Sequence, residues 1–462
     1  MPSLTRRSFA AGGLALAAPR TRPNILLLMT DQQSISALSA AGSPYLRTPH
    51  FDRLAEQGTR FANSWCASPV CSPSRSAIVS GCYPTRTGVV YNGDPYKPEV
   101  PCLGEIFEAA GYETAWAGKW HLPGPFPGAY TDDSPQPHRA RGFEFLPFKM
   151  QSRSEIAYGD FTDDPIARAA ADFLRRPHSK PFLLAVSIHN PHDICYWVMD
   201  KLPPHHPARA EFGVAPDKLP PLPGNHLPGP QEPEFIGMCR RRDHYGEENT
   251  YTPKWDELRW RRYLYGYYRM TERADASLGL VLQTLRSQGL DDNTIVMLTS
   301  DHGEGMAAHR WVVKLMLWQE VVSVPMIWRW PGKIPADRVE KRSLVSGIDI
   351  VPTLCDLAEI QPPRVQHGDS LAPALRGGRP LKRESLFAQL APDTKDHSLQ
   401  GRAVRTGKYK YIRFSTGGNP ELFHDLEADP GETRNLAKDP SHAARMSKHR
   451  QLLDDWTKKT ET

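Results

Sequence analysis

Continuous apolar runs alternate with amphipathic segments along the first two thirds of the chain. The runs have the length of strands that are buried on both faces of a parallel sheet. Between them, apolar residues recur at helical spacing. This alternation predicts an α/β protein with a doubly wound, mostly parallel sheet flanked by helices. We expect strands over residues 24–29, 112–117, 182–188 and 294–298, and helices over residues 50–57, 103–110, 167–176 and 255–287.

The pattern changes near residue 347, where short segments with a two-residue apolar alternation become frequent. These segments predict a smaller C-terminal α+β subdomain, residues 347–462, that packs on a main domain of residues 23–346. We expect it to contain a helix over 349–357, strands over 385–390, 402–414 and 422–426, and a terminal helix over 442–456.

Two long segments interrupt the alternation of strands and helices. Residues 122–164 follow the second predicted strand, and the proline-rich residues 195–254 follow the third. Segments of this length without secondary structure are usually functional or disordered. Both leave from the carboxyl ends of strands, so we expect them to form the walls of a substrate pocket. The triplet Arg240-Arg241-Arg242 is better explained as a solvated basic turn than as a site for an anionic sugar chain.

The first 22 residues read as an export leader. Thr5-Arg6-Arg7-Ser8-Phe9 is a twin-arginine pattern, a weakly apolar stretch follows it, and Ala15-Leu16-Ala17 offers a cleavage site. The apolar stretch is too short to span a bilayer. We therefore predict a periplasmic or secreted protein, exported by the twin-arginine route, with no stable membrane insertion.

Charge and cysteine content exclude some classes of function. The 57 basic and 52 acidic residues nearly balance, giving a formal net charge of +5. This balance, without a recognisable motif, argues against nucleic-acid binding. The seven cysteines show no metal-type Cys-x-x-Cys spacing, and their odd number fits one cysteine that is reserved for chemistry.

Polar clusters follow all four predicted strands of the main domain. In an open α/β sheet, ligands bind outside the carboxyl ends of the strands, so these side chains are expected to converge. Carboxylates at two of the ends suit a hard cation such as Ca²⁺, and an adjacent histidine leaves Mn²⁺ or another transition metal open. The clusters contain Asp31-Gln32, Lys119 with His121, His192, and Asp301-His302.

A short helix is predicted directly after Cys71, with Pro73 in its first turn and Gly81 as its stop signal. Cys71 would then lie at the positive end of the helix, beside free backbone N–H groups that attract anions. Arg75, one turn further on, adds a permanent charge with a fork of donors. The combination predicts a site that attacks a tetrahedral oxyanion ester.

The same residues resemble a known signature. Cys71-Ser72-Pro73-Ser74-Arg75 is similar to the sequence at which type I sulfatases, members of the alkaline phosphatase superfamily, convert cysteine to formylglycine. The resemblance extends along most of the chain. It includes Gly118-Lys119-Trp120-His121, Asn190-Pro191-His192, the stretch from His309 to Lys314, and the C-terminal residues 421–430 with Asn435-Leu436.

The resemblance implies a fold like that of alkaline phosphatase and a bound divalent metal, with Ca²⁺ favoured and Mn²⁺ possible. It implies maturation by a formylglycine-generating enzyme. The chain departs from the family at one point, because Gln32 follows Asp31 where two adjacent aspartates are common. The implied metal ligands are Asp31, Gln32, Cys71, Asp301 and His302.

The implied reaction is hydrolysis of a sulfate ester, with a sulfated carbohydrate as the expected substrate. Hydrated formylglycine at position 71 would attack sulfur, and His192 with Lys314 would protonate the departing alcohol. His121 would then take a proton so that sulfate leaves, while Lys119, Lys314 and Arg75 offset negative charge. The substrate-binding residues implied are Lys119, His192, Lys314 and His309.

Two other functions are compatible with the sequence. The first is a formylglycine-type phosphonate monoester hydrolase or phosphodiesterase of the same superfamily, which Asp31-Gln32 keeps open. The second is a non-catalytic protein that binds sulfated glycans, although the chain retains every expected catalytic residue. Parallel assays with an aryl sulfate and an aryl phosphonate ester distinguish the enzymes.

Overall fold

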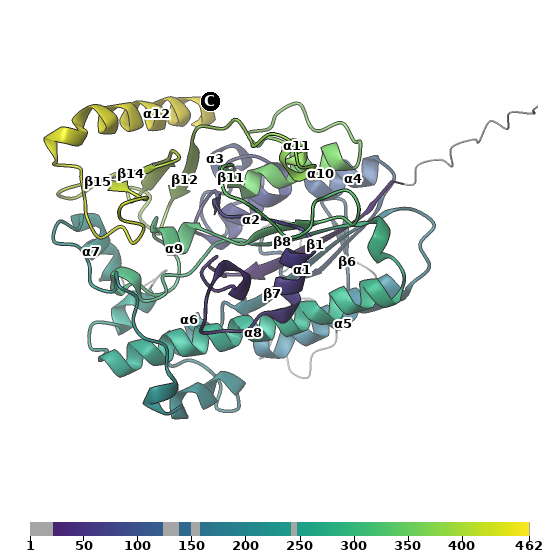
Figure 1. Ribbon diagram of the computed structural model, residues 1–462, viewed down its shortest axis with the longest axis horizontal. Coiled ribbons are helices and arrows are strands. Elements are labelled where there is room, and N and C mark those ends of the chain that lie inside the picture. Colours follow the sequence, from purple (N-terminus) through teal and green to yellow (C-terminus); the bar gives the residue numbers. More distant parts are fainter. Residues whose placement is uncertain (1–21, 123–137, 149–157, 242–246, 462) are drawn as a thin grey trace, which may run out of the picture.

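A nine-stranded sheet forms the centre of the protein (Figure 1). The computed structural model describes residues 22–122, 138–148, 158–241 and 247–461. The predicted export leader therefore lies almost entirely outside the described residues, as do Arg242 and parts of the segment 122–164. The strand order is β10-β2-β9-β8-β1-β7-β4-β6-β5.

Four adjacent strands at the middle of this sheet run parallel, in the order β8-β1-β7-β4. They are the four apolar runs of the sequence, extended by one to three residues at their carboxyl ends, and almost every side chain in them is buried. Their bounds are β1 Asn24–Asp31, β4 Glu113–Gly118, β7 Phe182–Pro191 and β8 Thr294–Ser300.

The outer strands are shorter, and three of their pairings are antiparallel, namely β8 with β9, β2 with β9, and β5 with β6. A separate two-stranded pair joins β3 with β11. The bounds of these strands are β2 Thr59–Phe61, β3 Ser64–Trp65, β5 His138–Ala140, β6 Phe143–Phe145, β9 Met326–Arg329, β10 Arg338–Glu340 and β11 Val345–Ser346.

Helices cover both faces of the central sheet (Figure 1). The long α8 and α5 lie on one face, and α2, α4, α10 and α11 lie on the other. Apolar residues from both layers and from the strands form one large hydrophobic core. The helices are α1 Pro49–Glu56, α2 Cys71–Ser80, α3 Pro84–Thr87, α4 Leu103–Ala109, α5 Gly159–Arg175, α8 Glu257–Ser287, α9 Gln319–Val322, α10 Ile350–Leu357 and α11 Ala372–Leu375.

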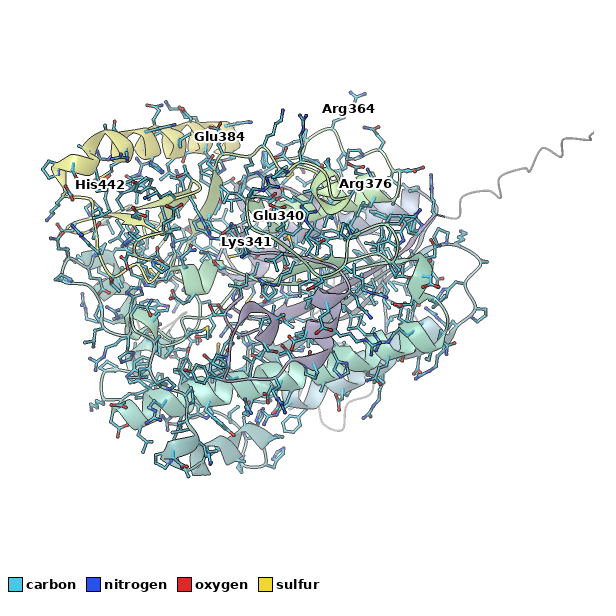
Figure 2. All side chains as sticks on the ribbon, viewed as in Figure 1. Glu340, Lys341, Arg364, Arg376, Glu384 and His442 are labelled. Carbon is cyan, nitrogen blue, oxygen red and sulfur yellow. The ribbon has the colours of Figure 1, made fainter. Side chains whose placement is uncertain are left out.

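The C-terminal part of the chain builds an antiparallel four-stranded sheet with α12 across it, at one end of the molecule (Figure 1). The predicted α/β class with a smaller C-terminal α+β unit is therefore confirmed. Its elements are β12 Leu386–Leu390, β13 Gly401–Arg405, β14 Tyr409–Phe414, β15 Glu421–Asp425 and α12 Ala443–Glu461. Arg364 is exposed and projects from the upper edge of the molecule (Figure 2).

The C-terminal unit contains a buried ion pair, and one of its two members also contacts the main domain. Lys410 of β14 and Glu432, just after β15, are both fully buried, and Lys410 Nζ lies 2.7 Å from Glu432 Oε1. The other carboxylate oxygen accepts a hydrogen bond at 2.6 Å from the backbone N–H of Gln319, the first residue of α9. Glu432 thereby connects the C-terminal unit to the loop that precedes α9.

The segment 195–254 is not the structureless loop that its prolines suggest. Its described part contains α6 Ile194–Val198, α7 Glu234–Arg240 and three short 3₁₀ helices. The prolines fall between these helices or at their starts, where the missing N–H costs nothing. Tryptophan, tyrosine and aliphatic side chains from α6 and α8 share one buried cluster, which holds this segment on the main domain.

All seven cysteines are buried thiols, and no disulfide joins any of them. Within the described residues, no helix combines the length and the apolar character that a membrane span requires.

Candidate active site

The carboxyl ends of the four parallel strands meet at one edge of the central sheet. Because the strands are adjacent and parallel, they place the polar residues at or just beyond their ends side by side. The sequence-predicted residues that this brings together are Asp31, Lys119, His121, His192, Asp301 and His302, with Cys71 and Arg75 from α2.

Arg75 holds the two aspartates of this group together. The guanidinium is fully buried; Nη2 donates to Asp31 Oδ2 at 2.8 Å and Nε donates to Asp301 Oδ2 at 2.9 Å. Nη1 reaches the Ser187 hydroxyl at 2.9 Å. A second cation, Lys119 Nζ, lies 2.5 Å from Asp31 Oδ2. Burial by itself would raise the pKa of Asp31, but Lys119 and the other cations outweigh it and hold this pKa well below its usual range.

The helix α2 begins at Cys71, one residue earlier than the sequence predicts. Val70 therefore stands in the position before the helix that was expected for Cys71. The helix ends at Gly81, whose φ of 74° is the left-handed conformation expected of a glycine stop. Every residue of α2 is buried, so the positive end of this helix faces the site without competing water. Cys71 therefore lies at a helix end that stabilises an anion.

Two nitrogen atoms contact the Cys71 sulfur directly. Lys314 Nζ lies 3.1 Å from Sγ, and His302 Nε2 lies 3.2 Å from it. Burial disfavours the thiolate, but these two residues and Lys119 outweigh burial and hold the pKa of Cys71 well below its usual range. The environment at position 71 is therefore built to stabilise negative charge.

Lys314 also contacts His192, with 3.0 Å between Nζ and Nε2. An ammonium group has no acceptor, so Lys314 donates and His192 Nε2 carries a lone pair. Burial, followed by repulsion from Lys314 and Lys119, lowers the pKa of His192 to about 4. A proton of Lys314 is thus hydrogen-bonded to His192 directly beside Cys71.

His121 lies at the rim of the site. Its backbone oxygen accepts a hydrogen bond at 2.5 Å from Ser72 Oγ, and its side chain contacts Cys71. The residue is exposed by surface area, yet desolvation of the ring lowers its pKa from the ordinary value, an effect that the contact with Cys71 partly opposes. A neutral imidazole at this point can accept a proton from a group at position 71.

Four of these residues fit a divalent cation. One ligand atom from each of them lies within 4.8 Å of the others. Asp31 Oδ1 is buried without a hydrogen-bond partner. His302 Nδ1 lies 3.0 Å from the Gly303 oxygen, a contact that would hold the N–H there and leave the Nε2 lone pair for a bound cation. Two carboxylates and an oriented imidazole suit the cation site that the sequence predicts, and its members are Asp31, Cys71, Asp301 and His302.

Gln32, the fifth predicted metal ligand, does not present its side chain to this group. Its backbone has a φ of 70°, and its amide nitrogen donates to Glu304 Oε2 at 2.6 Å. The amide also contacts Cys195 Sγ at 3.3 Å. Only the backbone N–H of Gln32 points to the metal group, where it donates to Asp301 Oδ1 at 3.0 Å. The left-handed backbone conformation of Gln32, which the sequence pattern does not reveal, turns its side chain away from the metal group.

His309, predicted to bind substrate, lies in a different place. Its ring stacks on Trp318 with 4.0 Å between centroids, and none of the contacts recorded for it among the described residues involves Cys71. It lines a cavity of about 250 Å³ between the main domain and the C-terminal unit. The other residues around this cavity include Glu232, Leu422, His424 and Glu432.

Sequence reasoning missed a second acidic cluster behind His192. His206 Nε2 lies 3.1 Å from Asp193 Oδ2, and its Nδ1 accepts a hydrogen bond at 3.2 Å from the backbone N–H of Ala208. Because both ring nitrogens are engaged, His206 has no lone pair for a metal. Asp160 is the third member of the cluster. The contacts with His206 hold Asp193, which directly follows His192.

The fold and the site together define a class of protein: an α/β enzyme of the alkaline phosphatase superfamily, with its candidate site at the carboxyl edge of the sheet. The sequence profile of the family described as Sulfatase matches residues 23–360, and the profile of the N-sulphoglucosamine sulphohydrolase C-terminal region matches residues 307–459. The chain belongs to the sulfatase family and is a sulfuric ester hydrolase.

Characterised relatives cover nearly the whole chain. The chain is 32% identical to a Δ4,5-hexuronate-2-O-sulfatase of Bacteroides thetaiotaomicron over 96% of this chain and 91% of that protein. It is 33% identical to an ulvan-active sulfatase of Formosa agariphila over 91% of this chain and 78% of that protein. A solved 2-O GAG sulfatase superposes with a TM-score of 0.82 at 30% identity, covering 95% of this chain and 93% of that one.

Proposed function

We propose that the protein hydrolyses the sulfate ester of a sulfated carbohydrate and releases inorganic sulfate, with Cys71 converted to formylglycine before it acts. The contacts around Cys71 carry this proposal. Its sulfur lies at the positive end of a buried helix and within 3.2 Å of both Lys314 Nζ and His302 Nε2. The Cys-x-Pro-x-Arg sequence around it is the one that a formylglycine-generating enzyme would modify.

The side chains around position 71 fit distinct tasks. A hydroxyl of the hydrated aldehyde would attack sulfur, while Lys119 and Lys314 offset the charge of the sulfate group. The proton shared by Lys314 and His192 would pass to the leaving alcohol oxygen. His121 would then remove the proton of the remaining hydroxyl, so that sulfate leaves and the aldehyde reforms.

A divalent cation, Ca²⁺ being our preference, would be held by Asp31, Asp301 and His302 together with residue 71. When bound, it supplies positive charge that stabilises the sulfate oxygens and the attacking hydroxyl. Arg75 keeps both carboxylates in place through its hydrogen bonds at 2.8 and 2.9 Å.

The substrate class is supported by the relatives. The hexuronate-2-O-sulfatase and the ulvan-active sulfatase are both named for sulfated carbohydrates. We infer the same class for this chain, together with twin-arginine export of a protein already modified at Cys71. Twin-arginine export carries folded proteins, so modification of Cys71 would precede it.

The test is a co-expression experiment. The protein is produced with a formylglycine-generating enzyme, and the peptide that contains Cys71 is weighed by mass spectrometry. Sulfate release is then measured on a panel of sulfated mono- and disaccharides and on 4-nitrophenyl sulfate. The proposal expects a mass decrease for the thiol-to-aldehyde change and turnover that Cys71→Ala abolishes. Full activity with an unmodified Cys71 would exclude it.

A phosphonate monoester hydrolase is the second candidate. The corresponding enzyme of Agrobacterium radiobacter has the same fold, with a TM-score of 0.78 at 23% identity. A 4-nitrophenyl phosphonate ester assayed beside 4-nitrophenyl sulfate decides between the two, because the larger kcat/KM identifies the native ester.

A further inference from the structure

The loop that carries Lys314 has an unusual backbone. It leaves β8 after Ser300 and returns at α9, and several of its non-glycine residues have φ between 51° and 68°. L-residues disfavour this conformation, and it persists only when the surroundings hold it. The residues concerned are Met306, Ala307, His309, Arg310, Val313 and Leu315. Lys314 is therefore placed by outside contacts and not by local preference.

Glu304 makes the contacts that close this loop on itself. One carboxylate oxygen, Oε1, accepts hydrogen bonds from the backbone N–H of Gly305 at 2.9 Å and from the backbone N–H of Val313. The hydroxyl of Tyr263, on α8, donates to the same oxygen. Glu304 is fully buried, and Val313 directly precedes Lys314. The carboxylate thus fixes the backbone next to Lys314 from inside the protein.

The second carboxylate oxygen of Glu304 contacts the end of β1, where Asp31 lies. Oε2 accepts the hydrogen bond from Gln32 Nε2 at 2.6 Å, and Gln32 directly follows Asp31. The backbone of Gln32 is itself held by Asp301 Oδ1 and by the Tyr267 hydroxyl, at 3.0 and 2.8 Å. One buried carboxylate therefore spans the end of β1 and the loop of Lys314.

We propose that Glu304 is a positioning residue, which sets the distance between Lys314 and the reacting group at position 71 by bridging Gln32 and Val313. The inference rests on the proposed function, because it assigns Lys314 to proton transfer. Glu304 itself touches neither Cys71 nor His192 in any contact recorded within the described residues. Its effect must pass through the placement of Lys314 and not through its own chemistry.

A misplaced proton donor leaves a kinetic signature. The hydroxyl oxygen of a sugar is a poor leaving group and needs a proton, whereas 4-nitrophenolate leaves readily without one. General acid catalysis contributes roughly 10²- to 10⁴-fold where it is needed. A fault in the placement of Lys314 therefore slows hydrolysis of a sugar sulfate much more than hydrolysis of 4-nitrophenyl sulfate, whereas a loss of folded protein slows both equally.

The experiment compares kcat on these two substrates for the metal-loaded, formylglycine-containing enzyme. Glu304→Gln keeps the size of the side chain but turns an NH₂ group toward the NH₂ of Gln32. We expect kcat on the best sugar sulfate of the panel to fall at least about tenfold and kcat on 4-nitrophenyl sulfate to fall less than about threefold. Tyr263→Phe, which removes one donor to Glu304, should shift the ratio in the same direction by less.

Asp275→Asn is the matched control. Asp275 is also a buried carboxylate, but it accepts hydrogen bonds from the backbone of His50 and Phe51, in α1. It should leave the ratio unchanged. Equal losses on both substrates in Glu304→Gln would overturn the inference, and if that variant does not fold, an unchanged ratio in Tyr263→Phe would do so. A wild-type enzyme without sulfatase activity would instead refute the proposed function.

Discussion

Replacing Lys410 by methionine tests how much a buried ion pair inside the C-terminal unit stabilises the protein. The substitution keeps most of the side-chain volume and removes only the cation from a pair in which both groups are fully buried and 2.7 Å apart. Glu432 would keep its hydrogen bond from the Gln319 N–H, at 2.6 Å, but would lose its counter-charge. Breaking a buried pair by removing one partner costs about 3–5 kcal/mol, because the remaining charge stays desolvated.

The cost of Lys410→Met should depend on pH in a defined direction. In the wild type, burial raises the pKa of Glu432, but Lys410 outweighs burial and the pKa lies below its ordinary value. Without Lys410 the largest lowering effect is gone, and burial is opposed only by weaker contacts such as the Gln319 N–H and His424, so we expect the folded-state pKa to move above that of the unfolded chain. The variant then gains stability as the pH falls through this raised pKa, and its deficit is largest at higher pH.

The assay is guanidinium unfolding followed by tryptophan fluorescence at about pH 8 and about pH 5, on either side of the raised pKa. Lys201→Met is the control, because Lys201 and Glu247 form a pair with 51% and 30% exposed side chains and should contribute at most about 1 kcal/mol. A double variant, Lys410→Met with Glu432→Gln, should recover most of the loss. A deficit below about 1 kcal/mol for Lys410→Met, or one that does not change with pH, would refute the reasoning.

Three further predictions concern the site. Cys71→Ala should abolish sulfate release and lower the free energy of unfolding by no more than about 1.5 kcal/mol relative to the unmodified wild type, the cost of the small volume lost; unfolding curves and turnover check this. Removal of divalent metal with a chelator should abolish activity and lower the melting temperature, since two buried carboxylates lose a cation; returning Ca²⁺ should restore both. Gly118→Ala should prevent folding or cost several kcal/mol, because φ is +88° there and a Cβ would lie 2.1 Å from the Ser187 oxygen; circular dichroism and soluble yield measure it.

The large elements of the fold could be predicted because burial leaves a strong periodic signal. The run that begins at Asn24 is apolar throughout and forms a strand with nearly every side chain buried. The helix over 257–287 has the corresponding helical spacing. In contrast, α6 and α7 are short and lie among prolines. Their stability comes from packing, of α6 against α8 and of α7 in a cluster with Trp311 and the C-terminal sheet, which the local sequence does not encode.

The site residues that could be predicted are those at the carboxyl ends of the parallel strands. Parallel strands bring their carboxyl ends together whatever the details, which accounts for Asp31, Lys119 and Asp301. The direction of Gln32 was not predictable, because a single φ of 70° reverses it. Glu304 follows Asp301-His302-Gly303 directly and could have been noticed as a further carboxylate at the same strand end, but only the structure shows where it points.

The absence of disulfides among seven buried thiols has a practical and a biological consequence. No step of folding waits for an oxidant or a disulfide isomerase, so the chain can reach its final state in a reducing compartment and keep it in an oxidising one. A protein of this kind can be handed from one compartment to another without a change of covalent structure. Thiol reductants in a purification buffer should accordingly leave its unfolding temperature unchanged.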